Sequence, residues 1–170
     1  TSFEGIEQLP PAHVLTVPVD DPSSGAPERY WSLDPSPLDI GFEEAAARLR
    51  DLFLASVTLH LRSDVPVGTA LSGGIDSSAI VGAMRRIGGP GLDLHTVSYR
   101  SDDPALDESR WVDVAAAAVG ARVHATNPAP AEMAGRLERV VAAQDEPFGS
   151  TSIAAQHAVF ERAHEAGLKV

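Results

Sequence analysis

The chain has 170 residues, of which 13 are Lys or Arg and 24 are Asp or Glu, so its formal net charge is -11. This length fits one domain, or one domain with an extension, and 44% hydrophobic against 22% charged residues is typical of a soluble globular protein. The acidic balance argues against broad binding to the nucleic-acid backbone, which requires clustered Lys and Arg. No apolar run approaches the roughly 18 residues of a membrane helix, and the first residues lack the basic and apolar parts of a secretory signal.

The chain contains no cysteine. Disulfides, thiolate metal sites and a cysteine nucleophile are therefore excluded within it. Its six histidines show no spacing typical of a zinc site. We expect a cytoplasmic protein that contacts neither nucleic acid nor membrane.

Residues 1–40 are rich in proline, which excludes a long helix there. Val14–Val17 is the one short strand that this segment predicts. The segment lacks the apolar pattern of an independent core. We therefore expect an extension that belongs to a longer protein.

A helix is predicted over residues 41–62, where apolar side chains recur at steps of three and four. One apolar stripe is expected to contain Phe42, Ala45, Ala46, Leu49, Leu52, Phe53 and Val57. The charged residues of this segment lie mostly off the stripe.

From residue 65 onward, short apolar strands alternate with helices. Strands are predicted over residues 65–71, 95–99 and 121–125, and helices over 76–86, 108–119, 132–143 and 153–166. This alternation predicts an α/β fold with a parallel twisted sheet and flanking helices. Because a fourth strand is expected to begin at Leu168, we expect a fold that is truncated at its C-terminus.

The segment between the first of these strands and its helix carries the chemistry. It reads Leu71-Ser72-Gly73-Gly74-Ile75-Asp76-Ser77-Ser78. The N-terminus of a helix offers free N–H groups and a partial positive charge to an anion. The two glycines allow a sharp turn and a close approach to that anion, and the serine hydroxyls add hydrogen-bond donors.

Asp76 is the unexpected member of this segment, because a carboxylate repels phosphate unless a metal ion bridges the two. Mg²⁺ does so readily, and the segment therefore predicts a cradle for magnesium pyrophosphate. It is neither a Walker A loop nor a GxGxxG loop. The structural alternative is a tight turn followed by a helix N-cap.

Ser72–Ser78 matches the PP-loop of the ATP pyrophosphatases, which have an adenine nucleotide alpha hydrolase-like fold and cleave ATP between its α and β phosphates. The surrounding segments resemble the synthetase domain of the glutamine-dependent asparagine synthetases. The similar segments are residues 3–13, Tyr30-Trp31, 65–68, 107–109, Gly120, His124 and 145–148. The family usually has Pro-Gly-His where this chain has Pro11-Ala12-His13.

The resemblance implies that residues 1–40 join a missing amidotransferase domain to residues 41–170, the N-terminal part of the synthetase domain. The complete enzyme would use ATP to adenylate the side-chain carboxylate of aspartate and would release pyrophosphate. Ammonia from glutamine, supplied by a separate N-terminal domain, would then attack the acyl group to give asparagine and AMP. The implied ligands are ATP, Mg²⁺, aspartate and ammonia, and the full-length protein is expected to be a homodimer.

The resemblance also implies roles for single residues. Pyrophosphate would be held by Ser72, Gly73, Gly74, Ser77 and Ser78, and Mg²⁺ by Asp76. The adenosine would be flanked by Leu71, Val97 and Tyr99, although the family often has a smaller apolar residue at the position of Tyr99. Further catalytic residues of the acyl site are expected beyond Val170, so we expect this chain to be inactive alone.

Other segments leave alternatives open. The candidate substrate-binding residues follow the third strand and its helix: Asp145, Glu146, Ser150, Thr151 and Ser152. The acidic loop 102–108 is either a solvated turn with a helix cap or a loop that closes over the nucleotide. Arg85-Arg86 is interpreted as a structural pair at a helix C-terminus.

Two other functions remain open besides asparagine synthesis. A related amidating or cyclising enzyme, such as a β-lactam-synthetase-like one, would share the loop but act on another carboxylate. A degenerate module would bind nucleotide without turnover.

Overall fold

The computed structural model describes residues 1–169. Its first compact unit is Thr1–Gly41, and the second begins at Phe42. In the first unit, β1 (His13–Leu15) pairs antiparallel with β2 (Pro27–Arg29), and the 3-10 turn η1 (Pro22–Ser24) lies between them in the chain. The strand predicted near Val14 is confirmed in part. The second strand was not predicted, because Pro27-Glu28-Arg29 has no apolar alternation and becomes a strand only by pairing.

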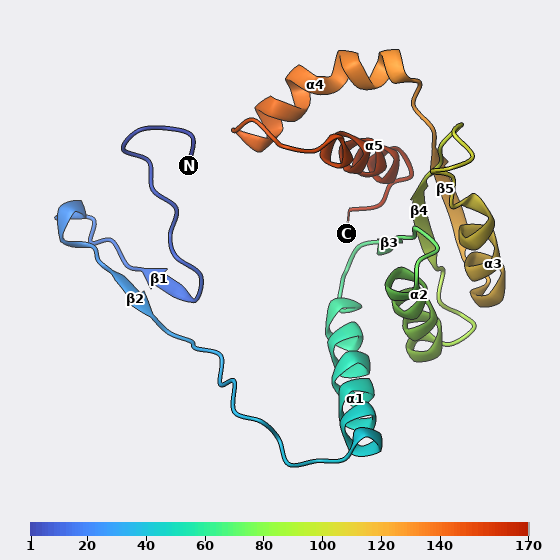
Figure 1. Ribbon diagram of the computed structural model, residues 1–170, viewed down its shortest axis with the longest axis horizontal. Coiled ribbons are helices and arrows are strands. Elements are labelled where there is room, and N and C mark those ends of the chain that lie inside the picture. Colours follow the sequence, from blue (N-terminus) through green and yellow to red (C-terminus); the bar gives the residue numbers. More distant parts are fainter. Residues whose placement is uncertain (170) are drawn as a thin grey trace. The chain divides into compact units, whose positions relative to one another are not determined.

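The second unit is built on a parallel sheet with the strand order β3-β4-β5 (Figure 1). Its strands are β3 (Gly68–Ala70), β4 (His95–Tyr99) and β5 (Arg122–Thr126). The helices α2 (Ile75–Gly88) and α3 (Ser109–Val119) connect successive strands. The predicted α/β class is confirmed, as is the span of β4. β3 is shorter than predicted because Pro66, which has no N–H, lies in its predicted first half.

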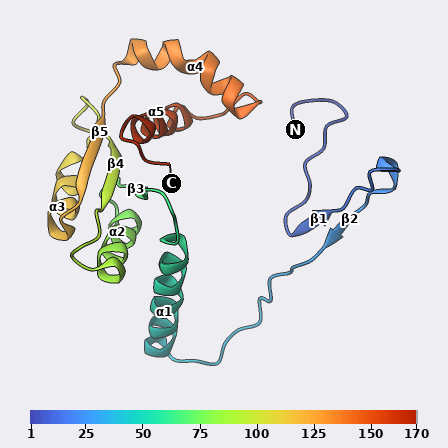
Figure 2. The same cartoon turned by 180° about the vertical axis from the view of Figure 1, so that it is seen from behind.

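The main core lies between this sheet and the helices α1 (Phe42–His60), α2 and α3. Its most buried members are Leu71, Val81, Met84, Leu94, Val112 and Ala116. On the other face, α5 (Thr151–Glu165) packs against β4 and β5, and α4 (Pro130–Gln144) packs on α5 (Figure 2). Within the described residues, no helix is long and apolar enough to cross a membrane.

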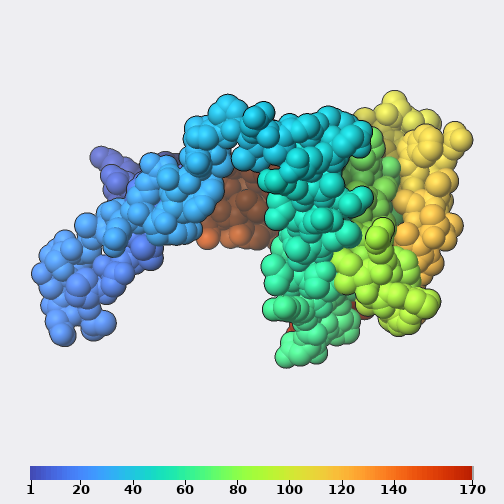
Figure 3. Space-filling view, turned by 90° about the horizontal axis from the view of Figure 1, so that it is seen from below, coloured from blue at the N-terminus to red at the C-terminus, as the bar shows by residue number. Residues whose placement is uncertain are grey.

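The helix α1 forms as predicted, but the expected apolar stripe is largely exposed over its first three turns. Phe42, Leu49 and Leu52 are 82%, 69% and 70% exposed, whereas Val57 is buried. Phe53, close to Val57, packs against the core. The apolar residues of α1 occupy two faces of the helix. Only the face that contains Phe53 and Val57, toward the C-terminal end of α1, is packed against the core, because α1 contacts α2 there. Figure 3 shows α1, drawn from cyan to green, open to solvent along much of its length.

The predicted fourth strand is not present in the described part of the chain. Leu168 is buried, but neither it nor Lys169 belongs to a strand, and Val170 lies outside the described residues. Leu168 instead packs beside Gly68 at the start of β3, where a Cβ on the glycine would lie 2.7 Å from the leucine Cδ1. The apolar side chain of Leu168, from which a strand was predicted, is thus explained by its packing against the start of β3.

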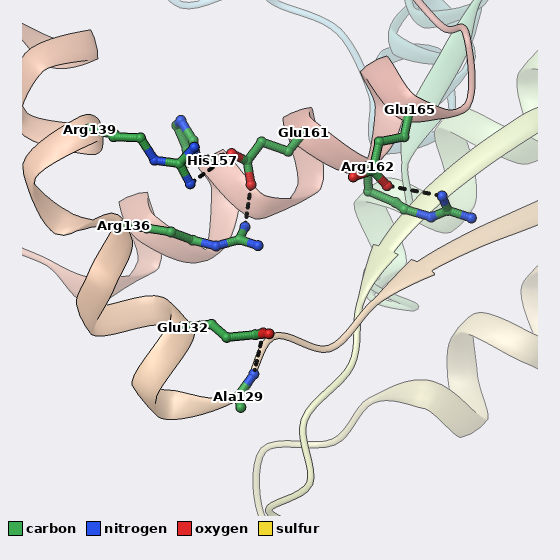
Figure 4. A network of polar contacts seen from close by, with 8 residues as sticks. All are labelled: Ala129, Glu132, Arg136, Arg139, His157, Glu161, Arg162 and Glu165. Atoms are coloured by element: carbon green, nitrogen blue, oxygen red, sulfur yellow. Dashed lines mark hydrogen bonds and ion pairs between the residues drawn. The ribbon is translucent and has the colours of Figure 1, made fainter.

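Charged side chains join α4 to α5 (Figure 4). The carboxylate of Glu161 forms an ion pair with Arg136 and lies 3.3 Å from Arg139 Nη2. His157 Nδ1 lies 3.8 Å from the same carboxylate. One acidic group on α5 thus holds two arginines of α4, and the buried Val140 closes the same interface from α4.

Arg85 ties the end of α2 to the end of α3. Its guanidinium donates to the carbonyls of Val119 at 2.6 Å, Gly89 at 2.7 Å, Leu92 at 2.9 Å and Gly120 at 3.2 Å. These carbonyls lie at helix ends and in the following turn, where the helix itself supplies no donors. The interpretation of this arginine as structural is confirmed.

We predict that Arg85→Met lowers the free energy of unfolding by about 2–3 kcal/mol, because several carbonyls lose a charged donor at once. Arg86→Met is the matched control, since Arg86 is exposed at the next position of the same helix. Urea unfolding of both variants tests this. Equal losses in the two variants would contradict the assignment.

A histidine pair links β4 and β5. His95 Nδ1 lies 2.8 Å from His124 Nε2, and the rings are parallel within 2°. Asp93 accepts from His95 Nε2 at 3.1 Å, and this bond is the main reason why the pKa of Asp93 is below its ordinary value. Because neutral His95 carries its proton on Nε2, where it donates to Asp93, its Nδ1 accepts from His124 Nε2.

Burial lowers the pKa of His124, and the charges of His95, Arg162 and Arg122 act in the same direction. Folding thus favours the neutral form of His124. The resulting contribution to the free energy of unfolding is fully present above the ordinary histidine pKa of about 6.5. That contribution is lost as the pH falls through the lower pKa of the folded state.

We therefore predict that acidification from pH 7.5 to 5 destabilises the parent chain more than it destabilises His124→Gln, whose amide can still donate to His95. Urea unfolding at both pH values measures the difference. His164→Gln, at an exposed position of α5, is the control and should retain the parent's pH dependence. An unchanged pH dependence in His124→Gln would contradict the prediction.

Candidate functional site

The predicted phosphate loop leaves the sheet at the carboxyl end of β3. The Leu71 N–H donates to the Val97 carbonyl at 2.9 Å, which extends the ladder by one residue. Ser72 and the glycines follow, and α2 begins at Ile75. Because the strands are parallel, this loop shares one edge of the sheet with Tyr99 and Thr126, the last residues of β4 and β5.

Gly73 is the residue on which the turn depends. Its φ is +82°, in the left-handed region that favours glycine. A Cβ at this position would lie 2.6 Å from Trp111 Cβ and 2.8 Å from Val112 N, in the first turn of α3. The backbone of the loop is therefore in direct contact with the backbone of α3.

Gly74 has a different role from that expected. Its φ of -68° and ψ of 166° are open to any residue, and it forms the N-cap position of α2. The nearest atom to a Cβ there would be Ser72 Oγ at 3.4 Å. The expectation that both glycines provide the turn is thus wrong for Gly74, which leaves open space where a ligand can approach.

The serine hydroxyls hold the loop together from within. Ser77 Oγ accepts from the Ser72 N–H at 3.3 Å, donates to the Gly74 carbonyl at 3.2 Å, and lies 3.1 Å from Ser72 Oγ. The Gly74 N–H approaches Ser72 Oγ at 3.4 Å. Among the described residues, the side chain of Ser78 has no such partner. The three serines therefore differ in how free their hydroxyls are for a ligand.

The start of α2 presents free donors. The first intrahelical bond runs from the Ser78 N–H to the Gly74 carbonyl at 3.0 Å. Within the described part of the chain, the N–H groups of Ile75, Asp76 and Ser77 have no hydrogen-bond acceptor. They form a row of donors at the positive end of the helix dipole, an arrangement suited to an anion.

Asp76 lies in the first turn of α2 with its side chain exposed. No hydrogen bond or ion pair to its carboxylate occurs among residues 1–169. Mg²⁺ prefers oxygen ligands and keeps several waters, so one free carboxylate beside a phosphate group fits this ion. The described side chains form no group of three or more His, Asp or Glu around a metal position, and any such ion would take its remaining ligands from phosphate and water.

The two strand residues expected near the adenosine differ in surroundings. Val97 is 3% exposed and lines a pocket of about 450 Å³ between the sheet and α5, together with Ala70 and Phe160. Tyr99 is 36% exposed at the carboxyl end of β4. The roles of Leu71, Val97 and Tyr99 beside a nucleotide stay predictions.

The acidic loop after β4 is internally bonded. Asp107 accepts from the N–H and the hydroxyl of Ser109 at the start of α3, and these bonds lower the pKa of Asp107. Asp103 accepts from the Ala105 N–H at 2.9 Å. Asn127 Nδ2 donates to Asp102 at 2.6 Å and so ties this loop to the end of β5. These contacts support the turn-and-cap interpretation.

The candidate substrate residues lie at the turn between α4 and α5. Asp145 ends α4 with a φ of +59°, and Ser150 caps α5 by accepting from the Ser152 N–H at 3.2 Å. Glu146 is half-buried, whereas Thr151 is exposed. The hydrogen bonds of Ser150 and Ser152 stay within this turn. A role of these residues in substrate binding stays a prediction.

Two residues next to the loop were missed. Ser98 is 1% exposed and donates from Oγ to the Leu71 carbonyl at 2.7 Å. Trp111 touches Gly73, is 54% exposed, and carries the Arg110 guanidinium 4.9 Å from its ring centre. A hydroxyl near the end of a buried strand was the only available signal for Ser98. No signal in the sequence pointed to Trp111, because its contact with Gly73 depends on how α3 packs against the loop.

We predict that Gly73→Ala destabilises the chain by at least about 1–3 kcal/mol, because the left-handed conformation is strained for alanine and the new methyl group meets the backbone of α3. Gly74→Ala, the adjacent control, should change stability by less than about 1 kcal/mol, because the smaller entropy of the unfolded chain is offset by the poorer N-cap residue. Urea unfolding measures both. A larger loss of stability in Gly74→Ala than in Gly73→Ala would show that the turn is assigned to the wrong glycine.

Comparison with known proteins places the chain in a family. The sequence model of the asparagine synthase family matches residues 48–170. Glutamine-hydrolyzing asparagine synthetase 3 of Bacillus subtilis is 32% identical over 157 residues, which cover 85% of this chain and 25% of that protein. Amidase chyE of Penicillium rubens is 29% identical over 100% of this chain and 27% of its own length. Amidase chry2 of Gibberella zeae is 27% identical over 99% of this chain and 27% of its own length.

The chain thus spans about a quarter of the length of these relatives. The family match covers the entire sheet and the phosphate loop. This chain belongs to the asparagine synthase family.

Proposed function

We propose that this chain is the ATP-binding part of an enzyme that activates a carboxylate with ATP, releases pyrophosphate and forms an amide. Family membership supports this class of reaction, as do the names of the asparagine synthetases that it resembles. The observation that carries the proposal is a row of N–H groups at the start of α2, those of Ile75, Asp76 and Ser77, which have no acceptor within residues 1–169. They follow directly after the turn at Gly73.

The loop would hold the pyrophosphate part of ATP through these backbone donors. Ser78 would add a free hydroxyl, and Ser72 and Ser77 would contribute by exchanging their internal hydrogen bonds for ligand contacts. Gly73 and Gly74 would let the phosphate oxygens approach the backbone closely. Asp76 would hold Mg²⁺, which would neutralise the charge that develops on the leaving pyrophosphate.

In the proposed reaction, no side chain of the loop has to form a covalent bond. A carboxylate oxygen attacks the α-phosphorus, the bond to the bridging oxygen breaks, and pyrophosphate leaves with that electron pair. Ammonia then attacks the acyl carbon and AMP leaves. The loop contributes by positioning the phosphates and by stabilising the leaving group through fixed N–H dipoles.

The preferred assignment for the complete protein is asparagine synthesis. Aspartate would be the carboxylate and glutamine the source of ammonia, through a separate N-terminal domain that residues 1–40 would join. Leu71, Val97 and Tyr99 would flank the adenosine, and Asp145, Glu146, Thr151 and Ser152 would lie near the amino-acid substrate. We further propose a homodimer that works in the cytoplasm.

A second assignment rests on the two fungal amidases, which align with nearly the whole of this chain. They support a relative that uses the same loop on a different carboxylate. The carboxylate specificity of the complete protein separates this assignment from asparagine synthesis.

We predict that the chain binds magnesium pyrophosphate and that Asp76→Asn weakens this binding about tenfold or more, while binding of pyrophosphate in EDTA changes little. Isothermal titration with and without Mg²⁺ measures this. Glu43→Gln removes another exposed carboxylate, in the first turn of α1, and serves as the control. Absence of binding to the parent chain would overturn the proposal.

The reaction itself is tested in a protein extended to the length of the relatives, by ATP-dependent pyrophosphate release with a panel of acids. Release that requires aspartate supports asparagine synthesis. Release with another acid alone supports the amidase-like assignment. Nucleotide binding without release with any acid would mean a degenerate module and contradict the proposed chemistry.

A further inference from the structure

The peptide that enters the phosphate loop is hydrogen-bonded on both sides by serine side chains. Ser98 Oγ, on β4, donates to the Leu71 carbonyl at 2.7 Å. Ser77 Oγ, on α2, accepts from the Ser72 N–H at 3.3 Å. The Leu71–Ser72 peptide plane is therefore fixed by side chains from two different elements, β4 and α2.

The bond from Ser98 takes the place of a sheet bond. The Leu71 N–H bonds to the Val97 carbonyl, so a continued parallel ladder would give the Leu71 carbonyl the Tyr99 N–H as its donor. The described residues show no such bond. The hydroxyl satisfies the carbonyl from the side and lets the backbone leave the sheet one residue earlier.

We propose that Ser98 is a positioning residue that sets the orientation of the loop's N–H donors and thereby the affinity of the loop for pyrophosphate. This inference rests on the proposed function of the loop. Ser98 itself is 1% exposed and cannot reach a ligand in solvent, so its effect passes through the Leu71–Ser72 peptide.

The burial of Leu71 explains why this bond matters. Leu71 is 1% exposed, so its carbonyl has little access to water. A buried carbonyl without a donor is costly, and without the Ser98 hydroxyl it would turn toward another donor. That rotation turns the Ser72 N–H with it, because both atoms belong to one planar peptide. The Ser77 bond and the donors that follow would then be displaced.

Thr96 provides a matched control on the same face of β4. It is 0% exposed, and its hydroxyl has no hydrogen-bond partner in the described part of the chain. Thr96→Val thus removes a buried hydroxyl of the same strand without removing a hydrogen bond. Ser98→Ala removes the bond to Leu71, and Ser98→Cys replaces the hydroxyl by a weaker donor of similar shape.

The test compares these three variants with the parent at a temperature at which all are folded. Two quantities are measured: the amide proton and nitrogen chemical shifts of Ser72, Gly73 and Gly74 without ligand, and the dissociation constant for magnesium pyrophosphate. We expect Ser98→Ala to move the three amide signals and to weaken binding about five- to tenfold. Thr96→Val should leave both unchanged, and Ser98→Cys should fall between parent and Ser98→Ala.

Unmoved loop signals and parent-like affinity in Ser98→Ala would overturn the inference, as would equal effects in Thr96→Val. If Ser98→Ala does not fold, Ser98→Cys decides by the same criteria. If the parent chain does not bind pyrophosphate, the proposed function fails, and the ligand-free amide shifts still decide whether Ser98 orients the loop.

Discussion

The contact between the Gly73 backbone and the first turn of α3 constrains everything at the carboxyl edge of the sheet. A methyl group does not fit between them, since its carbon would lie 2.6 Å from Trp111 Cβ. The loop is therefore pressed against a helix that follows a different strand. At the start of α3, Asp107 accepts hydrogen bonds from the N–H and the hydroxyl of Ser109, the first residue of the helix. The loop, the acidic turn and α3 thus form one packed unit that a change in any of them disturbs.

This constraint gives the hydroxyl groups of the loop different tasks. Ser77 uses its hydroxyl both as an acceptor and as a donor inside the loop, whereas the Ser78 hydroxyl has no partner among residues 1–169. Two residues that look equivalent in the sequence thus differ in role, because the helix starts at Ile75 and turns them in different directions. The ligand-binding capacity of such a loop depends as much on the groups that hold its backbone as on those that reach the ligand.

Much of the fold follows from local patterns, because the alternation of apolar strands and helices, closed by glycines such as Gly120, is encoded residue by residue. The turn at Gly73 was predicted for the same reason. Burial was harder to predict: α1 has apolar residues on two faces, and only packing on α2 decides that Val57 is buried and Leu49 is not. The contacts of Ser98, Arg85 and His124 were not predictable, since each joins atoms more than 25 residues apart in the chain.

The charge distribution bears on which anion such a loop can hold. The sequence has no Lys or Arg from Val65 to Met84, and the whole chain carries a formal charge of -11. The arginines of the neighbouring elements have contacts of their own: Arg100 donates from Nη2 to Asp113 at 2.7 Å, and Arg110 lies over the ring of Trp111. The proposed attraction of an anion to the loop therefore depends on the N–H dipoles, which act only over short distances. The net negative charge of the chain repels the anion and opposes this attraction. Under these conditions a polyphosphate already neutralised by a divalent cation is favoured over the free anion, and the exposed carboxylate of Asp76 is then an attractive group in the site.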